Sequence, residues 1–226
     1  LSGGIDSAVT AAMYADILGP ENILLLNLPS QYNSVTTQSL AQSLAQALGA
    51  NYASISIGHS CEHTIDQLEN TSIICYKDNS SFNLCISQLG RENIQARDRG
   101  ARIIAAASAA FGGAFSCNSN KAEIAIGYAT FYGDICGAVA MIGDLWKRQV
   151  YALGRYLNDE VFKREVIPDE IFTIRPSAEL SDAQTVGNGG DPLIYEYHDY
   201  LYQAFIEGRH KATPADILRW DRDGSL

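Results

Sequence analysis

Apolar and polar positions along the chain follow patterns that predict strands alternating with helices. Ile23–Leu26 is a short, continuous apolar run bounded by Pro20 and Pro29, as is typical of a parallel strand covered on both faces. Residues 36–48 carry apolar side chains at helical spacing and are followed by a glycine, which predicts an amphipathic helix. The alternation over residues 52–57 predicts a second strand.

The rest of the chain continues this alternation, except for two stretches without a regular period. Residues 71–89 mix polar and apolar side chains and are interpreted as irregular. Residues 175–192 are rich in glycine and small polar residues and predict a long loop, which in a compact domain is usually functional or mobile. The remaining predicted elements are helices over 61–69, 92–111, 121–128, 144–156 and 193–207, a strand over 114–117, and a last helix that begins at Thr213–Pro214.

This order of elements predicts an α/β fold with a doubly wound parallel sheet, built as one domain over residues 1–226. Ligands of such sheets bind beyond the carboxyl ends of the strands. The segments that begin at Ser2 and follow Cys117 both fall at strand-to-helix turns, so we expect them to face the same crevice. The strand that should precede Ser2 is missing, and we expect the domain to be truncated at its N-terminus, with this strand upstream.

Composition and charge narrow the class of protein. Apolar residues make up 46% of the 226 positions and charged residues 19%, which is ordinary for a globular domain. The net charge of −10 argues against a nucleic-acid partner, and no apolar run reaches the length of a membrane span. Five scattered cysteines without a Cys-x-x-Cys pair favour a reducing cytoplasm over a disulfide framework.

The segment Ser2–Ser7, with the sequence Ser-Gly-Gly-Ile-Asp-Ser, carries the most chemical information. Adjacent glycines let the backbone approach a ligand closely, and the free N–H groups of the helix that follows favour an anion. A carboxylate beside a phosphate is repelled unless a divalent cation lies between them, so Asp6 is interpreted as a magnesium ligand. The segment is not a Walker A loop and resembles the PP-loop of ATP pyrophosphatases. The alternative is an ordinary glycine-rich turn before a helix.

Further blocks of polar residues follow this loop. Taken alone, Arg97, Glu123 and Lys147 could each be solvated surface residues, as most charged side chains are. Their order behind the loop favours a common site instead. The blocks are Asn93–Arg99, Asn118–Glu123, Gly127–Asp134, Ile142–Lys147 and Pro176–Leu180.

This ordered set resembles the ammonia-transferring domain of the NAD synthetase family, over nearly the whole chain. Members carry Ser-Gly-Gly-x-Asp-Ser, Asn-x-x-Ala-Arg-x-Arg and a lysine in Gly-Asp-x-x-Lys, and these patterns stand here at Ser2–Ser7, Asn93–Arg99 and Gly143–Lys147. Gly190–Pro192 and Tyr197–Tyr200 are most similar to members with a fused glutaminase domain. The resemblance implies the Rossmann-like adenine nucleotide alpha hydrolase (PP-loop) fold.

The resemblance also implies a reaction and its partners. The carboxylate of nicotinic acid adenine dinucleotide attacks the α-phosphorus of ATP, and ammonia then displaces AMP to give NAD, with Mg²⁺ as the metal. It implies a cytoplasmic homodimer or larger homo-oligomer without nucleic-acid or membrane partners. It leaves open whether ammonia arrives free or from a glutaminase domain upstream. The alternatives are another PP-loop amidotransferase, similar to GMP synthetase, and a catalytically silent nucleotide-binding module.

Roles for individual residues follow from the same resemblance. Asp6 and Lys147 are expected to be catalytic, and Asp6 and Glu123 to bind Mg²⁺. The residues expected to bind ATP are Ser2, Gly3, Gly4, Asp6, Ser7, Asn118, Lys147 and Ser177. Those expected to contact the dinucleotide substrate are Arg97, Glu123, Tyr128, Phe131, Asp134, His210 and Lys211.

Three positions depart from the family pattern. Asn118 stands where many members have a threonine that contacts ATP. Phe131 and Ala138 replace a lysine and an aspartate of the smaller, ammonia-dependent members. The substrate contacts at these positions are therefore left open.

Overall fold

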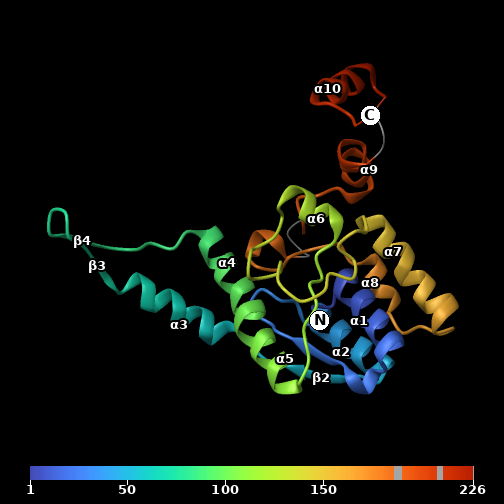
Figure 1. The fold of residues 1–226 in the computed structure, drawn as a ribbon, viewed down its shortest axis with the longest axis horizontal. Coiled ribbons are helices and arrows are strands. Elements are labelled where there is room, and N and C mark those ends of the chain that lie inside the picture. Colours follow the sequence, from blue (N-terminus) through green and yellow to red (C-terminus); the bar gives the residue numbers. More distant parts are fainter. Residues whose placement is uncertain (186–189, 208–210, 226) are drawn as a thin grey trace.

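The structure is a computed structural model of the 226-residue chain and describes residues 1–185, 190–207 and 211–225. It consists of a main body from which a long helical arm ending in a hairpin extends on one side, while two helices stand at one end (Figure 1). Across these three ranges, the helices are all too short or too polar to cross a membrane.

The body contains a pair of parallel strands, β1 (Leu24–Asn27) and β2 (Asn51–Ser54). Helix α1 (Ile5–Leu18) precedes β1, and helix α2 (Val35–Leu48) connects the two strands. The predicted α/β class with parallel strands is therefore confirmed. The second strand ends at Ser54, earlier than predicted, because the residues after it turn into the next helix.

The largest hydrophobic cluster joins this βαβ unit to the later helices α7 (Lys147–Tyr156) and α8 (Asp169–Thr173). Val9 of α1, Leu44 of α2 and Val150 of α7 are all fully buried in it. Burying each such side chain stabilises the fold by about 1.5–3 kcal/mol. Because α1 packs directly against α7, the first turns of these two helices are held in a fixed relation.

The segment predicted as a single helix over 92–111 is helical but not uniform. It consists of α4 (Gln88–Arg97), a π-helical stretch at Asp98–Ile104 and α5 (Ala105–Phe111). Gly100 in the π-helical stretch packs so closely on a later loop that a Cβ there would lie 2.2 Å from the carbonyl oxygen of Gly133. π-helical turns of this kind are often found at functional sites.

The prediction of irregular structure over 71–89 is wrong. Helix α3 (Gly58–Glu69) leads into an antiparallel hairpin of β3 (Ser72–Cys75) and β4 (Ser80–Asn83), which extends away from the body (Figure 1). The turn is stabilised locally, because the side chain of Asp78 accepts a hydrogen bond from the backbone N–H of Ser80 at 3.0 Å. β4 is exposed along its whole length and β3 is only partly covered, so the pattern lacks a buried apolar face.

Helix α6 (Lys121–Ile126) begins where predicted, whereas the strand expected over 114–117 is reduced to a single parallel bridge between Ser116 and Val139. Helix α7 begins at Lys147 rather than at residue 144, because residues 141–145 form turns instead of a first helical turn. Short helical turns also occur at Pro20–Asn22, Leu157–Val161 and Asp182–Gln184.

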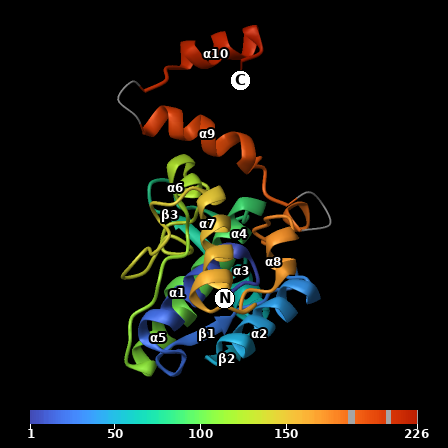
Figure 2. The same cartoon turned by 90° about the vertical axis from the view of Figure 1, so that its right-hand side faces the viewer.

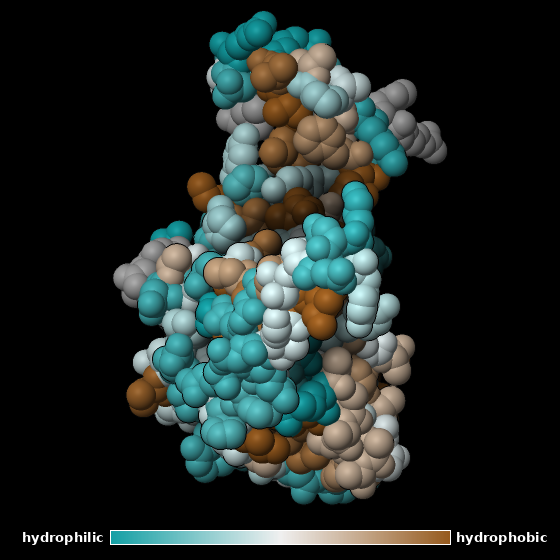
Figure 3. All heavy atoms as spheres, turned by 90° about the vertical axis from the view of Figure 1, so that its left-hand side faces the viewer, coloured by the Kyte–Doolittle hydropathy of each residue, from teal (hydrophilic) through white to brown (hydrophobic). Residues whose placement is uncertain are grey.

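Two helices lie at one end of the molecule, α9 (Tyr195–Ile206) and α10 (Pro214–Asp223), as Figures 1 and 2 show. α10 begins as predicted, with the Thr213 side chain accepting a hydrogen bond from the N–H of Asp216. α9 packs on α6 and α7 through a small cluster that includes Trp146. Apolar side chains gather on the surface at the level of these two helices (Figure 3).

Candidate active site

A cavity of about 460 Å³ lies beyond the C-terminal end of β1. Its walls come from the Ser2–Ser7 loop, the first residues after β1, the π-helical stretch, the segment that follows Cys117, and the long loop after α8. The prediction that the first loop and the segment after Cys117 face one crevice is therefore confirmed. Such a location is the usual one for a ligand of an α/β sheet.

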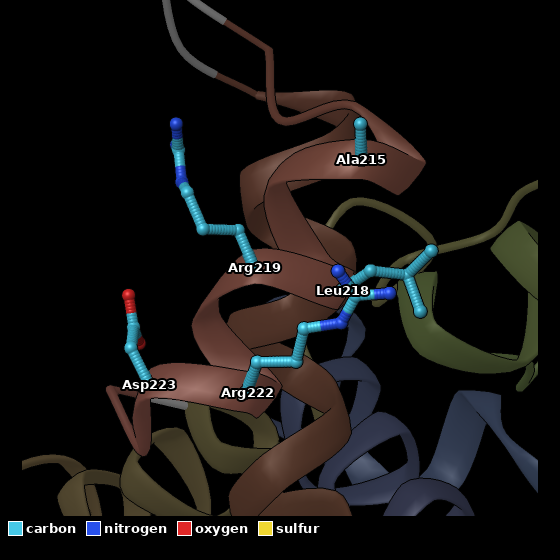
Figure 4. Close-up of a pocket in the computed structure, with 5 residues that line it drawn as sticks. All are labelled: Ala215, Leu218, Arg219, Arg222 and Asp223. Atoms are coloured by element: carbon cyan, nitrogen blue, oxygen red, sulfur yellow. The ribbon is translucent and has the colours of Figure 1, made fainter.

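A second hollow, of about 330 Å³, lies on α10 and is lined by residues of that helix alone, from Ala215 to Asp223 (Figure 4). Its arginines lie on one helix, and within the described ranges the residues that line it come from α10 alone. A ligand site normally has convergent polar groups on several elements. The cavity beyond β1 is therefore the candidate active site.

The Ser2–Ser7 loop has the geometry expected of a phosphate cradle. Gly3 adopts a φ of +89°, and a Cβ at this position would lie 2.0 Å from the carbonyl oxygen of Thr37. The hydroxyl of Ser7 accepts from the backbone N–H of Ser2 and donates to the carbonyl of Gly4, each at 3.1 Å, which closes the loop. The N-cap residue of α1, Gly4, makes no side-chain cap hydrogen bond, and the residues of this first turn line the cavity. The first N–H groups of a helix of 14 residues favour an anion at such a place.

Three charged residues from three helices meet beside this loop. The Nζ of Lys147, the first residue of α7, lies 2.5 Å from Oδ2 of Asp6 in α1 and 3.5 Å from Oε1 of Glu123 in α6. Asn120 joins the two carboxylates, because its Nδ2 donates to Asp6 at 3.0 Å and to Glu123 at 2.8 Å. Residues far apart in the sequence thus form one cluster, as the sequence predicts for Asp6, Glu123 and Lys147.

When both carboxylates are ionised, the cluster carries one more negative charge than Lys147 balances. Burial, with the Asp6 carboxylate adding to it, raises the pKa of Glu123 from its ordinary 4.5 to about 8. Burial alone would lower the pKa of the Lys147 ammonium, but Asp6 and Glu123 outweigh it and hold that pKa above its ordinary value. Lys147 therefore stays charged, while the two carboxylates repel each other.

The donor set of the cluster fits a magnesium ion. Mg²⁺ prefers oxygen ligands and is commonly held by one or two carboxylates together with phosphates of the substrate. Asp6 and Glu123 supply two carboxylates that share Asn120. Burial is the larger cause of the raised pKa of Glu123, and a divalent cation would relieve the repulsion from Asp6 that adds to it. Asp6 and Glu123 are thus the residues that would hold the ion.

Sequence reasoning missed a second layer of polar residues around Lys147. The ring of Tyr195 lies under the ammonium, with Nζ at 4.8 Å from its centroid. The carboxylate of Asp191 accepts from the hydroxyl of Tyr195 at 2.9 Å and from that of Tyr128 at 3.4 Å. Burial raises the pKa of the Tyr195 phenol, and the Asp191 carboxylate adds to the rise, so Tyr195 remains a hydrogen-bond donor. In the sequence, the Gly-Asp-Pro segment at residues 190–192 was the feature that could have pointed to Asp191.

The start of α7 is fixed by another residue, Asp199, to which the sequence patterns assign no role. Asp199 of α9 is fully buried, and its Oδ2 accepts from the backbone N–H of Arg148 at 2.8 Å. A carboxylate at this point satisfies a free amide of the first turn and favours the helix dipole. Asp199 thereby holds the turn from which Lys147 extends.

The other residues predicted to bind ATP also line the cavity. Asn118 lies in its wall, and its Oδ1 is buried without a hydrogen-bond partner in the described ranges. A buried acceptor of this kind needs a donor, which a ligand could supply. Ser177 lines the cavity too and donates its hydroxyl hydrogen to the carbonyl of Gln184.

The residues predicted to contact the dinucleotide are only partly brought together. Tyr128 and Asp134 line the cavity, with Glu123. Arg97 and Phe131 lie outside its lining, where Nε of Arg97 donates to the carbonyl of Phe131 at 3.2 Å and both residues are exposed. Lys211 is exposed between α9 and α10, and His210 lies outside the described residues. The proposed contacts of these last four residues stay predictions.

The fold and the site together define the class of protein. A glycine-rich loop opens a helix at the carboxyl edge of parallel strands, and a lysine and two carboxylates stand beside it, as in PP-loop nucleotide-binding enzymes. The sequence profile of the NAD synthase family matches residues 1–220. The chain belongs to the NAD synthase family.

Individual relatives agree with this assignment. The chain is 38% identical over 205 residues to the glutamine-dependent NAD(+) synthetase of Xanthomonas campestris pv. campestris (strain 8004), covering 88% of this chain and 35% of that protein. The chain thus spans about a third of the length of the curated relatives that it matches.

Two solved structures are similar in fold and sequence. A glutamine-dependent NAD+ synthetase from Acinetobacter baumannii in complex with ADP has a TM-score of 0.66 at 30% identity, over 79% of this chain and 32% of that one. An NH3-dependent NAD synthetase from Campylobacter jejuni subsp. jejuni NCTC 11168, in complex with the nitrate ion, has a TM-score of 0.59 at 33% identity. That similarity covers 72% of this chain and 65% of the Campylobacter chain.

Proposed function

We propose that this chain catalyses the ATP-dependent amidation of nicotinic acid adenine dinucleotide to NAD, with AMP and pyrophosphate as the other products. The observation that carries the proposal is the cluster of Asp6, Glu123 and Lys147 beside the open N-terminus of α1, in a member of the NAD synthase family. This arrangement supports cleavage of ATP at its α-phosphate, since it offers amide donors and a lysine to the pyrophosphate that leaves.

The chemistry takes place in two displacements. A carboxylate oxygen of the dinucleotide attacks the α-phosphorus, and the bond to the β-phosphate oxygen breaks, so that pyrophosphate leaves. Ammonia then attacks the activated acyl carbon, and AMP leaves with the electron pair of the acyl–oxygen bond. Neither step needs a redox partner, and both depend on positioning and on stabilising negative charge.

The roles of the residues follow from where they stand. The loop Ser2–Ser7 and the first turn of α1 bind the β- and γ-phosphates, and Lys147 stabilises the charge that develops on the leaving pyrophosphate. Magnesium, when held by Asp6 and Glu123, neutralises the same phosphates. Asn118 and Ser177 contact the nucleoside part of ATP in the cavity wall.

The setting of the reaction is part of the proposal. The nitrogen is ammonia, either free or released from glutamine by a glutaminase domain, because the similar proteins are named for both nitrogen sources. The protein works in the cytoplasm as a homodimer or larger homo-oligomer, in which Arg97, Phe131, His210 and Lys211 reach the dinucleotide.

One assay tests the proposal. The purified protein is given ATP, Mg²⁺ and nicotinic acid adenine dinucleotide, with ammonium in one series and glutamine in another, and the products are separated by chromatography. We expect NAD, AMP and pyrophosphate in equal amounts with ammonium. Formation of ADP in place of AMP would contradict cleavage at the α-phosphate, and AMP without NAD would contradict the proposed acceptor.

A further inference from the structure

Glu179 is an unusual member of the cavity wall. It lies in the segment that follows Ser177, it is 3% exposed, and its backbone adopts a φ of 47°. A non-glycine residue in this left-handed region is strained, and such strain persists only where the surroundings hold it in place. The contacts of its side chain show what holds it.

The carboxylate of Glu179 binds the N-terminus of α2, far away in the sequence. One oxygen accepts from Nδ2 of Asn33 and from the hydroxyl of Thr37, each at 2.9 Å. The other oxygen accepts from the backbone N–H of Ser34, at 3.3 Å. With these donors engaged, the carboxylate caps a helix and is not available as a general base.

Thr37 connects this contact to the phosphate loop. Its hydroxyl donates to Glu179. Its carbonyl oxygen lies against Gly3, only 2.0 Å from the position that a Cβ on Gly3 would take. Thr37 is itself buried, at 6% exposure. One residue of α2 therefore touches both the loop that carries the phosphates and the segment that carries Ser177.

Two other hydrogen bonds of this wall segment, among the described residues, join neutral groups. The carbonyl of Pro176 accepts from the backbone N–H of Asp191, and that of Leu180 accepts from the side chain of Gln95, each at 2.8 Å. Hydrogen bonds to a charged group are roughly twice as strong as those between neutral groups. The Glu179 carboxylate therefore makes the strongest of these contacts, and its partners lie at the N-terminus of α2.

We propose that Glu179 is a positioning residue for ATP. By binding Thr37 and its neighbours, it sets the distance between the Gly3 loop and the Ser177 segment, the two walls between which the nucleotide lies. The inference rests on the proposed function, since it takes ATP as the ligand of the cavity. It adds a residue to which the resemblance assigns no role.

The test is substitution of Glu179 by Gln and by Gly, with Glu170→Gln as the matched control on an exposed carboxylate of α8. Glu179→Gln keeps the size of the side chain but removes the charge, and Glu179→Gly also removes the backbone strain. We expect both Glu179 variants to raise the KM and the Kd for ATP about tenfold, with kcat within about threefold of the wild type, which corresponds to the loss of one such hydrogen bond. A merely structural role would lower the amount of active protein and leave both constants unchanged.

Thr37→Val provides a second route that does not depend on the folding of the Glu179 variants. It removes the hydroxyl but keeps the carbonyl beside Gly3, so we expect the same rise in the Kd for ATP. The double variant Glu179→Gln/Thr37→Val should bind ATP no more weakly than Glu179→Gln alone, because the contact with Thr37 is one of those that Glu179→Gln already weakens. Additive losses would overturn the proposal.

The readouts separate this inference from the proposed function. The Kd for ATP is measured by calorimetry in the absence of the dinucleotide, so the positioning role is judged even if no NAD forms. An unchanged Kd in Glu179→Gln overturns the positioning role. Absence of NAD from a wild-type protein that binds ATP overturns the proposed function alone.

Discussion

The ammonium group of Lys147 lies 2.5 Å from the carboxylate of Asp6, although 141 positions separate the two residues in the sequence. The side chain of Lys147 is 3% exposed, and that of Asp6 is 19% exposed. Asp6 lies in the phosphate loop, in the first turn of α1, and Lys147 begins α7, so the packing of α1 on α7 brings the pair together. The lysine is thereby aimed at the point where the phosphates of ATP are proposed to bind.

Replacing Lys147 by Met should abolish most of the proposed activity. Met fills a similar volume but cannot stabilise the charge on the leaving pyrophosphate, so we expect kcat/KM to fall by about 10²–10³-fold. The measurement is the rate of NAD formation with saturating ammonium. Lys77→Met, on the exposed tip of the β3–β4 hairpin, is the matched control. If the Lys147 variant kept half of the wild-type rate, the lysine would have no catalytic role.

The raised pKa of Glu123 predicts how stability depends on pH when no metal is bound. The folded protein keeps a proton on Glu123 up to a pKa of about 8, whereas the unfolded chain releases it near the ordinary 4.5. Between these values the folded state binds more protons, so the free energy of unfolding falls as pH rises. Above the pKa that Glu123 has in the folded protein, this contribution to the free energy of unfolding is lost completely. Urea unfolding in EDTA at about pH 5 and about pH 9 measures this slope.

Glu123→Gln should remove that part of the slope, because the amide does not titrate. The exposed Glu170→Gln serves as the control and should keep the wild-type slope. Equal slopes in the two variants would show that Glu123 is not the group that takes up the proton.

Much of the fold could be predicted from local patterns, and the failures have physical causes. β1 is indicated by a continuous apolar run between two prolines. Helix α2 has a clear period and clear ends, since Ser34 caps it and Gly49 ends it in a left-handed conformation. The β3–β4 hairpin lacks a buried face, so only its turn residues, Asp78 and Asn79, could have indicated it. In the π-helical stretch, Gly100 packs closely on Gly133 of a later loop, and no local pattern reveals such a contact.

Some residues of the candidate site could likewise be predicted from the sequence, and others could not. Asp6, Glu123 and Lys147 could be predicted because they stand in ordered blocks behind a recognisable loop. Asp199 and Glu179 could not, because their importance lies in capping the first turns of helices that are distant in sequence. Such contacts are set by tertiary packing and carry no local signal.

Removing the Asp199 carboxylate should destabilise the fold. Asp199 is fully buried, and Asp199→Ala leaves the N–H of Arg148 without this partner, so we expect a loss of about 1–3 kcal/mol in the free energy of unfolding. Glu196→Ala, an exposed position on the same helix, should change it by less than about 0.5 kcal/mol. Chemical denaturation of both variants measures the difference. Equal losses would mean that Asp199 does not cap α7.

Replacing Gly3 by Ala should damage both the fold and the binding of ATP, for two separable reasons. The positive φ alone is expected to cost about 1 kcal/mol, and the Cβ would also meet the Thr37 carbonyl oxygen at 2.0 Å. Gly49 has a similar φ of +74° but no atom within 4 Å of its Cβ position, so Gly49→Ala measures the strain alone. We expect Gly3→Ala to lose about 1–3 kcal/mol more than Gly49→Ala in urea unfolding, and to raise the Kd for ATP at least about tenfold. If the two variants lost the same stability, the Thr37 carbonyl would not lie against the phosphate loop.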